Sequence, residues 1–232
     1  MRTVNFKKSY LKNPAGSCLA SYGDTVVLCT ATVEKRVPPF LEGSGQGWVS
    51  AEYAMLPGST PGGRKRRETL KPDGRSVEIK RLISRSLRAA VDMNKLGELS
   101  VIIDCDVLQA DGGTRTAAIS GGWIALWEAL HSLGLTGQPG CVQGQVGAVS
   151  AGIVDGKVIC DLDYQLDSRA EVDMNVVKLD SAYVEVQGTG ERSTFDRARL
   201  DEILNAADQG LEIIFREQRK TISSAIDRDL KK

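Results

Sequence analysis

The sequence predicts a mixed α/β (α+β) fold, formed by one compact domain in which helices pack on mixed sheets. Strand-like and helix-like segments follow in the order strands, helix, strand, helix, strands, helix, which differs from the strict alternation of a doubly wound parallel sheet. Gly23-Asp24 and Asp155-Gly156 each separate two apolar runs, as turns of β-hairpins do. The 232 residues contain no low-complexity linker, so residues 1–232 are expected to form a single domain.

Hydrophobic periodicity and breaker residues predict the individual elements in order. Apolar runs indicate strands at residues 16–22, 25–33, 48–55, 99–108, 145–154, 157–162, 173–178 and 182–187. Helical spacing predicts a helix from Asp73 or Ser76 to about Met93, a second over 114–133 and a closing amphipathic helix over 194–219. Residues 57–73 are expected to form a flexible loop rich in proline and glycine, and the charged tail at 221–232 is expected to fray.

The overall composition limits the partners and the location of the chain. Thirty basic and thirty acidic residues leave no net charge, so a polyanionic partner would have to be met by a local basic patch. No apolar stretch is long enough to span a membrane, and no secretory signal opens the chain. We therefore expect a cytoplasmic protein with no membrane partner.

Cysteine and histidine usage excludes several kinds of chemistry. The five cysteines are odd in number and lack CxxC spacing, which is typical of reduced cysteines in a cytosolic protein. The only histidine, His131, has no further ligand at zinc-binding spacing. Walker-type GxxxxGK[ST] and Rossmann GxGxxG motifs are absent as well. The polar chemistry of an enzyme would then depend on carboxylates, arginines, backbone groups or a metal.

The segment "DCDVLQADGGTRTAAISGG" predicts an oxyanion site. Asp111-Gly112-Gly113 ends a strand, and Arg115 then falls in the first turn of a helix, where the macrodipole is already positive. A cation at this end of a helix is destabilising by roughly 0.3–1 kcal/mol unless an anion lies beside it. Glycines, free backbone N–H groups and an arginine together favour an anion ligand. The alternative is a surface arginine beside an ordinary tight turn.

An acidic segment, "CDLDYQLDSRAEVDMNVV", and a basic loop provide two further candidates. Asp167 and Asp173 flank a short loop and would share a hard divalent ion such as Mg²⁺, or one of them would act as a general acid. The alternative is a solvated acidic turn. Four consecutive cations, Arg64, Lys65, Arg66 and Arg67, suit a mobile arm that contacts phosphodiesters, or else form a solvated surface run.

Six segments, taken in order, resemble the ribonuclease PH family: "GDTVVLCTATVE", "GQGWVSAEYAMLP", "GRSVEIKRLISRSLRAAVD", "DCDVLQADGGTRTAAISGGW", "DLDYQLDSRAEVDMNVV" and "EVQGT". The resemblance covers nearly the whole chain. It implies the single-domain fold of that family and a phosphate-dependent 3′→5′ exoribonuclease that trims tRNA precursors and other 3′-ended RNA. Such an enzyme uses inorganic phosphate as co-substrate, releases nucleoside diphosphates reversibly and requires a divalent metal, usually Mg²⁺. A homohexamer, built as a trimer of dimers, is also implied.

The resemblance also assigns roles to residues. The phosphate-binding positions of the family fall on Arg75, Gly113, Thr114 and Arg115, and its active-site aspartates, which are also the candidate metal ligands, fall on Asp167 and Asp173. Its tRNA-binding loop has an arginine directly after MLP, where this chain has Gly58, so the loop's role moves to the cluster at 64–67. Whether Asp173 holds a metal or donates a proton stays open. A catalytically idle, RNA-binding ring subunit of an exosome-like assembly is the alternative function.

Overall fold

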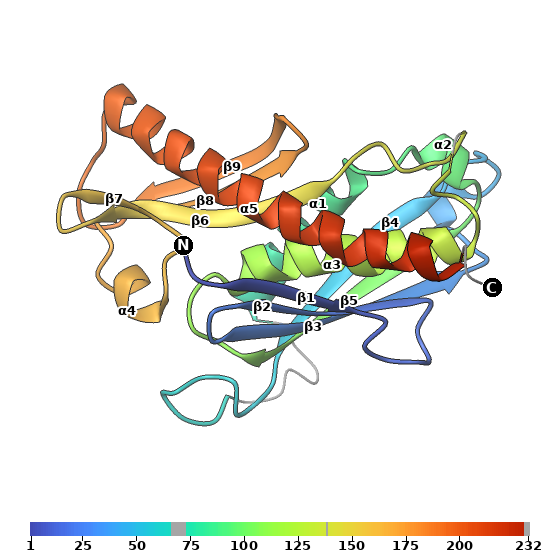
Figure 1. The fold of residues 1–232 in the computed structure, drawn as a ribbon, viewed down its shortest axis with the longest axis horizontal. Helices are drawn as coiled ribbons and strands as arrows, with labels where there is room; N and C mark the ends of the chain where they lie inside the picture. Colours follow the sequence, from blue (N-terminus) through green and yellow to red (C-terminus); the bar gives the residue numbers. More distant parts are fainter. Residues whose placement is uncertain (66–72, 138, 230–232) are drawn as a thin grey trace.

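The computed structural model describes residues 1–65, 73–137 and 139–229, with side chains described as far as residue 223. Within this part of the chain, two β-sheets and five α-helices form the mixed α/β fold that the sequence predicts (Figure 1). The two sheets lie on either side of a long central helix, so the chain forms layers of sheet, helix and sheet.

The first sheet holds five strands in the order β1-β2-β3-β5-β4. Its neighbours are antiparallel except β4 and β5, which are parallel because the first long helix connects them. Core-facing residues alternate with outward-facing ones, as in β5, where Val101, Ile103 and Cys105 are buried. The strands are β1 (Val4–Lys8), β2 (Gly16–Tyr22), β3 (Thr25–Glu34), β4 (Trp48–Met55) and β5 (Ser100–Gln109).

The second sheet is antiparallel, with four strands in the order β7-β6-β8-β9. Every residue of β6 is buried, because α3 packs on one side of this sheet and α5 also covers it. The strands are β6 (Val146–Val154), β7 (Lys157–Cys160), β8 (Val172–Leu179) and β9 (Ala182–Gly190). Both predicted hairpins are confirmed, and their turns use positive φ at Gly23, Asp155 and Gly156.

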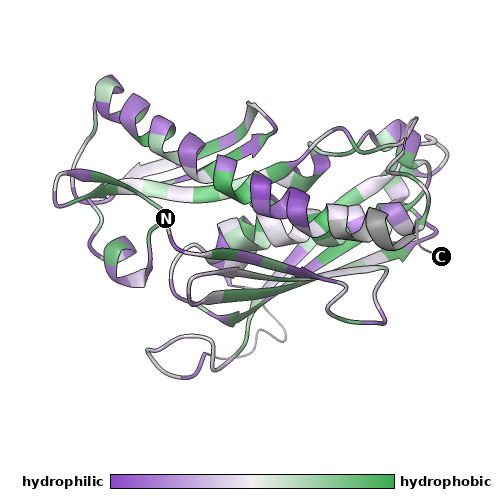
Figure 2. Cartoon of the chain, in the orientation of Figure 1, coloured by the Kyte–Doolittle hydropathy of each residue, from purple (hydrophilic) through white to green (hydrophobic). Residues whose placement is uncertain are grey.

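Three helices are long: α1 (Gly74–Arg88), α3 (Thr114–Ser132) and α5 (Arg197–Asp229). α3 is buried on nearly all sides because it packs against β2, β3 and β5 of the first sheet and β6 of the second. α1 covers β4, and α5 crosses both β1 and β6. Figure 2 shows hydrophilic and hydrophobic residues alternating along α5, as expected for an amphipathic surface helix. The short elements are η1 (Pro39–Leu41), α2 (Met93–Leu96) and α4 (Tyr164–Asp167).

Buried hydrogen bonds join the two sheets through α3. The Tyr22 hydroxyl donates to Ser120 Oγ at 2.8 Å and to the Ala148 carbonyl at 3.2 Å, which links β2, α3 and β6. The fully buried amide of Gln218 in α5 donates to the carbonyls of Ser120 and Val146 at 3.0 and 2.9 Å. These contacts satisfy polar groups that would be costly to bury unpaired, and they fix how the sheets face each other.

Several element boundaries differ from those predicted. β1 was not predicted, because five residues with two buried side chains, Val4 and Phe6, give too short a pattern. The predicted helix to about Met93 ends at Arg88, and Asp92 then starts α2 by accepting hydrogen bonds from Asn94 and Lys95. α5 continues to Asp229, past its predicted end at residue 219 and into the segment that was expected to fray.

All five cysteines are unpaired thiols, and Cys160 is half-buried whereas the other four are buried. Burial raises the pKa of Cys160 to about 11, which keeps this thiol protonated at neutral pH. Among the helices of the described residues, none combines the length and the apolar character that crossing a membrane requires.

Candidate functional site

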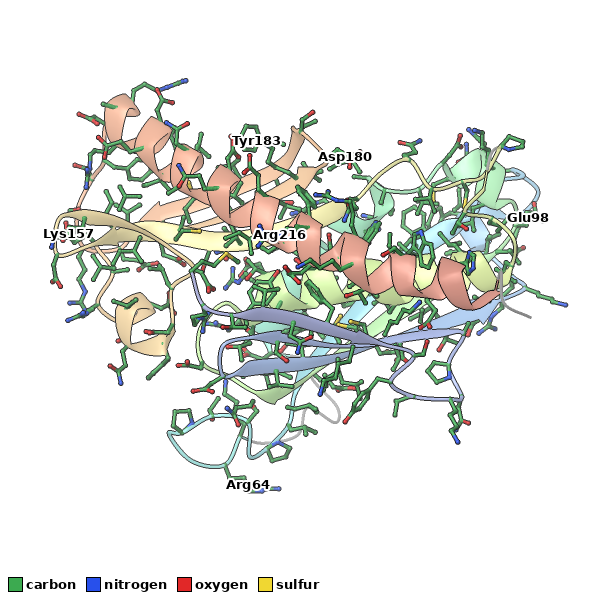
Figure 3. All side chains as sticks on the ribbon, in the orientation of Figure 1. Arg64, Glu98, Lys157, Asp180, Tyr183 and Arg216 are labelled. Carbon is green, nitrogen blue, oxygen red and sulfur yellow. The ribbon has the colours of Figure 1, made fainter. Side chains whose placement is uncertain are left out.

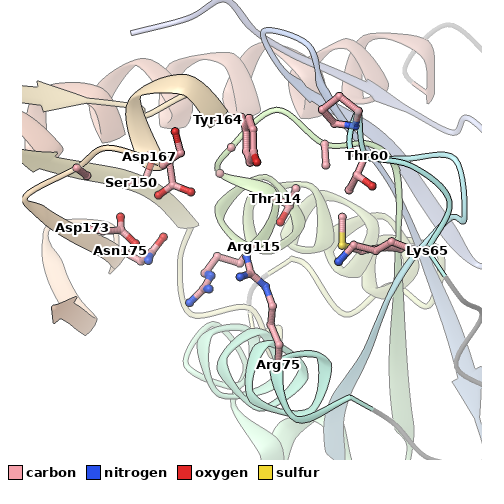
Figure 4. A pocket seen from close by; sticks show the side chains of 18 of the residues that line it. Thr60, Lys65, Arg75, Thr114, Arg115, Ser150, Tyr164, Asp167, Asp173 and Asn175 are labelled. Atoms are coloured by element: carbon pink, nitrogen blue, oxygen red, sulfur yellow. The ribbon is translucent and has the colours of Figure 1, made fainter. Parts of the chain in front are cut away.

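A pocket of about 740 Å³ opens where the two sheets meet. It is lined by the end of β4 and the loop after it, the start of α3, the strands β6 and β8, and α4. Figure 4 shows Arg75 and Arg115 pointing into this pocket toward the side that carries Asp167 and Asp173. The described residues of the predicted site that line the pocket are Arg64, Lys65, Arg75, Gly113, Thr114, Arg115, Asp167 and Asp173. Arg66 and Arg67 lie outside the described residues.

The turn between β5 and α3 depends on its glycines. Gly112 and Gly113 have φ values of 71° and 64°, a conformation that favours glycine. A Cβ at Gly112 would also lie closer to the Leu162 carbonyl oxygen than real Cβ contacts allow. The sequence predicted glycines that let a ligand approach. At Gly112, the close neighbour is instead the chain's own backbone, from the segment that leads to the aspartates.

The start of α3 presents backbone N–H groups to the pocket. Gly113 is the N-cap and has no side chain to cap the helix, so the first N–H groups have no partner within it. The Thr114 hydroxyl pairs with the Tyr53 hydroxyl of β4 at 2.9 Å. Burial raises the pKa of Tyr53, so this phenol stays protonated at neutral pH. The geometry is that of a helix N-terminus prepared for an anion.

Arg115 is held in place by two residues that sequence reasoning did not identify. Its Nη1 atom lies 3.5 Å from Glu78 Oε1 of α1 and donates to Gln187 Oε1 of β9 at 3.2 Å. Gln187 Nε2 in turn donates to Glu78 Oε1 at 2.8 Å, so the three side chains form a closed network. Both lie in segments that resemble the family, Glu78 in GRSVEIKRLISRSLRAAVD and Gln187 in EVQGT, but nothing in the sequence indicates that they meet. Arg115 therefore has protein partners at the helix start, besides any anion that it binds.

The structure divides the acidic segment at 161–173 into structural and pocket residues. The buried Asp161 binds Arg2, and Asp163 caps α4 by accepting from the Leu166 N–H at 2.9 Å. Glu171 accepts from the Gly156 N–H at 2.9 Å and so holds the β6–β7 turn. Asp167 and Asp173 are the two carboxylates of this segment that line the pocket.

The two pocket aspartates have raised pKa values. Burial raises the pKa of Asp173 to about 6, and the negative charge of Asp167 adds to the effect while Arg115 opposes it. Burial also raises the pKa of Asp167, against the opposing influence of Arg75 and Arg115. A carboxyl group with a pKa near 6 is suited to proton transfer close to neutral pH.

The same pair fits a divalent cation. Burial raises the pKa of both carboxyl groups, and the charge of Asp167 further raises that of Asp173, so a cation beside the pair would favour their ionised forms. Carboxylate oxygens are the ligands that Mg²⁺ prefers. In the described part of the chain, no cluster of three or more histidine, cysteine, aspartate or glutamate residues could hold a metal. A pair of carboxylates nevertheless meets the need of Mg²⁺, which commonly takes one or two of them and completes its shell with water and substrate phosphate.

Arg2 connects two of the backbone segments that form the pocket. Its guanidinium donates to Asp161 through Nε at 3.0 Å and Nη2 at 2.6 Å, and its backbone N–H donates to the same carboxylate at 2.8 Å. Nη1 donates to the Asp111 carbonyl, and Nη2 to the Leu162 carbonyl at 3.3 Å. Arg2 thus connects the glycine turn before α3 to the segment before α4. Sequence reasoning missed it, because its partners are more than a hundred positions away.

The basic loop forms the wall of the pocket that lies opposite Asp167 and Asp173 (Figure 4). Arg64 and Lys65 are exposed, and the Lys65 N–H donates to the Pro57 carbonyl at 2.8 Å, which closes the described part of the loop. Figure 3 places Arg64 at the outer end of this loop, away from the sheets. The two exposed cations give this wall of the pocket a positive charge.

Comparison with known proteins identifies relatives along the whole chain. Residues 1–130 match the model of the 3′ exoribonuclease family, domain 1, and residues 144–210 match that of domain 2. The chain is 52% identical over 228 residues to ribonuclease PH of Corynebacterium diphtheriae, covering 96% of this chain and 93% of that protein. It is 51% identical over 229 residues to ribonuclease PH of Corynebacterium kroppenstedtii, covering 96% and 89%.

Solved structures share the fold at lower identity. Rrp46 of rice (Oryza sativa) has a TM-score of 0.75 at 16% identity, covering 97% of this chain and 95% of that one. A chain of the Archaeoglobus fulgidus exosome, described as having RNA bound to the active site, has a TM-score of 0.73 at 22% identity, covering 89% and 84%. At these identities the likeness concerns the fold alone.

Proposed function

Because the chain belongs to the ribonuclease PH family of 3′ exoribonucleases, we propose that the pocket between its sheets is the site of phosphorolysis. The chain is a phosphate-dependent 3′→5′ exoribonuclease, a nucleotidyltransferase that releases nucleoside 5′-diphosphates. The single observation that carries the proposed site is the placement of Arg75, Arg115 and the start of α3 opposite Asp167 and Asp173 in one pocket.

Inorganic phosphate is proposed to bind at the start of α3. Arg75 and Arg115 supply charge-assisted hydrogen bonds, and the N–H groups that follow Gly113 supply further donors. Phosphate is already a competent nucleophile, so no histidine base is needed. The contribution of these residues is to bring one anion against another and to orient the attacking oxygen. Glu78 and Gln187 support this by holding the guanidinium of Arg115.

The scissile phosphodiester is proposed to lie beside Asp167 and Asp173. A divalent cation bound by these two carboxylates, most simply Mg²⁺, would neutralise charge on the scissile phosphate and on the leaving oxygen. A phosphate oxygen attacks the phosphorus of the last linkage, and the bond from that phosphorus to the 3′ oxygen of the preceding nucleotide breaks. The leaving 3′ oxygen takes up a proton, for which Asp173, with a pKa of about 6, is the candidate donor when no metal occupies its oxygens.

RNA with a free 3′ end is the substrate class, and tRNA precursors are the proposed natural members of it. The basic loop at 57–73, with Arg64, Lys65, Arg66 and Arg67, is proposed to contact the RNA backbone outside the pocket. Such contacts are independent of sequence, which suits an enzyme that removes any nucleotide.

A homohexamer in the cytoplasm is the proposed state of the enzyme, arranged as a trimer of dimers. Five unpaired thiols are compatible with a reducing compartment. Native mass measurement of the purified chain should give six times the 25.0 kDa of one chain. An RNA-binding subunit that is idle by itself would instead need a different partner chain to act.

The proposed function is tested with the purified chain alone and a tRNA that carries a short 3′ extension. Shortening of the RNA should depend on inorganic phosphate and should need no partner protein. Nucleoside monophosphates formed in phosphate-free buffer would indicate a hydrolase. A chain that binds the RNA but shortens it only in the presence of another protein would favour the idle ring subunit.

A further inference from the structure

An exposed aromatic ring lies inside the pocket and has no role in the proposed chemistry. Tyr164 is 55% exposed, and among the described residues that line the pocket it is the one with an aromatic side chain. In Figure 4 it lies between Asp167 on one side and Thr60 and Lys65 on the other. The ring therefore separates the carboxylate side of the pocket from the basic loop, where an RNA strand would enter.

The backbone of Tyr164 is firmly placed. Its N–H donates to Asp111 Oδ1 at 3.3 Å, and its carbonyl accepts from the Ser168 N–H at 3.0 Å. Asp163 caps the turn of α4 in front of it. A ring on a backbone fixed in this way loses little conformational freedom when a flat ligand binds to its face.

Tyr164 and Asp167 are neighbours on the single turn of α4. The two residues are the first and last of α4, and positions three apart on a helical turn are neighbours, roughly 5–6 Å between Cβ atoms. The carboxylate of Asp167 is assigned to the scissile phosphate, to which the last nucleotide is attached through its 5′ oxygen. The base of that nucleotide would reach the neighbouring ring.

We propose that Tyr164 stacks on the base of the 3′-terminal nucleotide and so positions the last phosphodiester against Asp167 and Asp173. This inference rests on the proposed function of the pocket. Stacking tolerates every base because each has a π face, whereas hydrogen bonds to base edges would favour one of them. An exonuclease that removes successive nucleotides of any identity needs a contact of this tolerant kind.

The test is a binding comparison in the Asp173→Asn background and in phosphate-free buffer, where neither phosphorolysis nor acid-assisted hydrolysis proceeds. The probe is a short single-stranded oligoribonucleotide, compared with the same oligonucleotide whose terminal base is replaced by hydrogen. Adding Tyr164→Ala should weaken binding of the intact probe about 5- to 150-fold, the range expected for loss of one base–aromatic stack. Binding of the probe without its terminal base should not weaken further.

Two further variants make the comparison specific. Tyr164→Phe keeps the ring and should recover most of the affinity that Tyr164→Ala loses. Tyr10→Ala removes another exposed tyrosine, 49% exposed and outside the pocket, and should bind both probes as the parent does. Equal weakening for both probes, no weakening for either, or loss of the oligomer in Tyr164→Ala would overturn the stacking role. Failure of the proposed function would show separately, as a wild-type chain without phosphate-dependent turnover.

Discussion

At the residue scale, the pocket places two arginines opposite two carboxylates, and neighbouring side chains hold one of them, Arg115. Arg115 is oriented by Glu78 and Gln187, so its guanidinium is fixed before an anion arrives. Asp173 is held in partly buried surroundings that raise its pKa to about 6. Each of these two features can be tested by one substitution.

Replacing Arg115 with alanine should raise the phosphate concentration needed for half-maximal rate. The substitution removes a charge-assisted contact worth roughly 1.5–3 kcal/mol, which corresponds to about 10- to 150-fold in phosphate affinity. RNA binding should stay near the wild-type value because the basic loop is untouched. The matched control is Arg197→Ala on the exposed surface of α5. Equal loss of phosphate and RNA affinity would contradict the assignment of Arg115 to phosphate.

Replacing Asp173 with asparagine should abolish turnover and at the same time stabilise the metal-free chain. The folded-state pKa of about 6 exceeds the ordinary value of 3.8, so the folded state binds the proton more tightly than the unfolded state. The wild-type chain therefore loses stability as the pH rises from about 4 to 6, by at most about 3 kcal/mol at 1.36 kcal/mol per pKa unit. The asparagine variant has no carboxyl group at this position and should not lose stability in this way as the pH rises.

Thermal unfolding in a chelator, followed from pH 4 to pH 8, measures this difference. The melting temperatures of wild type and Asp173→Asn should differ most above pH 6 and converge toward pH 4. Asp24→Asn, an exposed residue in the turn between β2 and β3, should show no such divergence. Substantial activity of Asp173→Asn across metal concentrations would show that the acidic turn has only a structural role.

At the scale of elements, the site depends on two connections held together by Arg2: the glycine turn that starts α3 and the segment that leads into α4. The buried carboxylate of Asp161 accepts hydrogen bonds from Arg2. Asp111 contacts both connections, since its carbonyl accepts from Arg2 and its side chain accepts from the Tyr164 N–H. These contacts connect the start of α3 to the segment that carries the pocket carboxylates.

Replacing Arg2 with methionine should weaken both the fold and phosphate binding. The change leaves the Asp161 charge buried without its partner, for which about 3–5 kcal/mol of unfolding free energy is the expected loss. Because Arg2 also holds the Asp111 carbonyl, the phosphate concentration for half-maximal rate should rise at temperatures where the variant is folded. Denaturant unfolding and phosphate titration measure the two effects. A destabilised variant with unchanged phosphate dependence would limit Arg2 to holding the fold.

The basic loop should control RNA binding without controlling chemistry. Replacing Arg64, Arg66 and Arg67 together with alanine should lower the slope of log affinity against log salt by up to about 2, since each contact to a single strand contributes about 0.7. Turnover of a short oligonucleotide should fall less than that of tRNA. The control removes the same charge from α5, through Arg216, Arg219 and Lys220. An unchanged salt slope in the loop variant would show that the loop does not contact RNA.

At the scale of the whole molecule, the sequence predicts what is local and misses what is brought together by folding. The hairpin turns and the helix start at Gly113–Arg115 were predictable, because glycine and apolar periodicity act within a few residues. The network of Glu78, Arg115 and Gln187 was not, because it joins three elements distant in the chain. The sequence offered five acidic residues between 161 and 173, and only the fold separates the pocket pair from those that cap or anchor.

The fate of the attacking phosphate distinguishes phosphorolysis from hydrolysis. The purified chain is incubated with a 3′-extended RNA and inorganic phosphate labelled on phosphorus, and the released nucleotides are separated. Phosphorolysis should release nucleoside 5′-diphosphates that carry the label in the β-phosphate, since the new bond joins the attacking phosphate to the terminal phosphorus. Wild-type chain should give this product and Asp173→Asn should not. Unlabelled nucleoside monophosphates as the main product would contradict phosphorolysis and indicate hydrolysis.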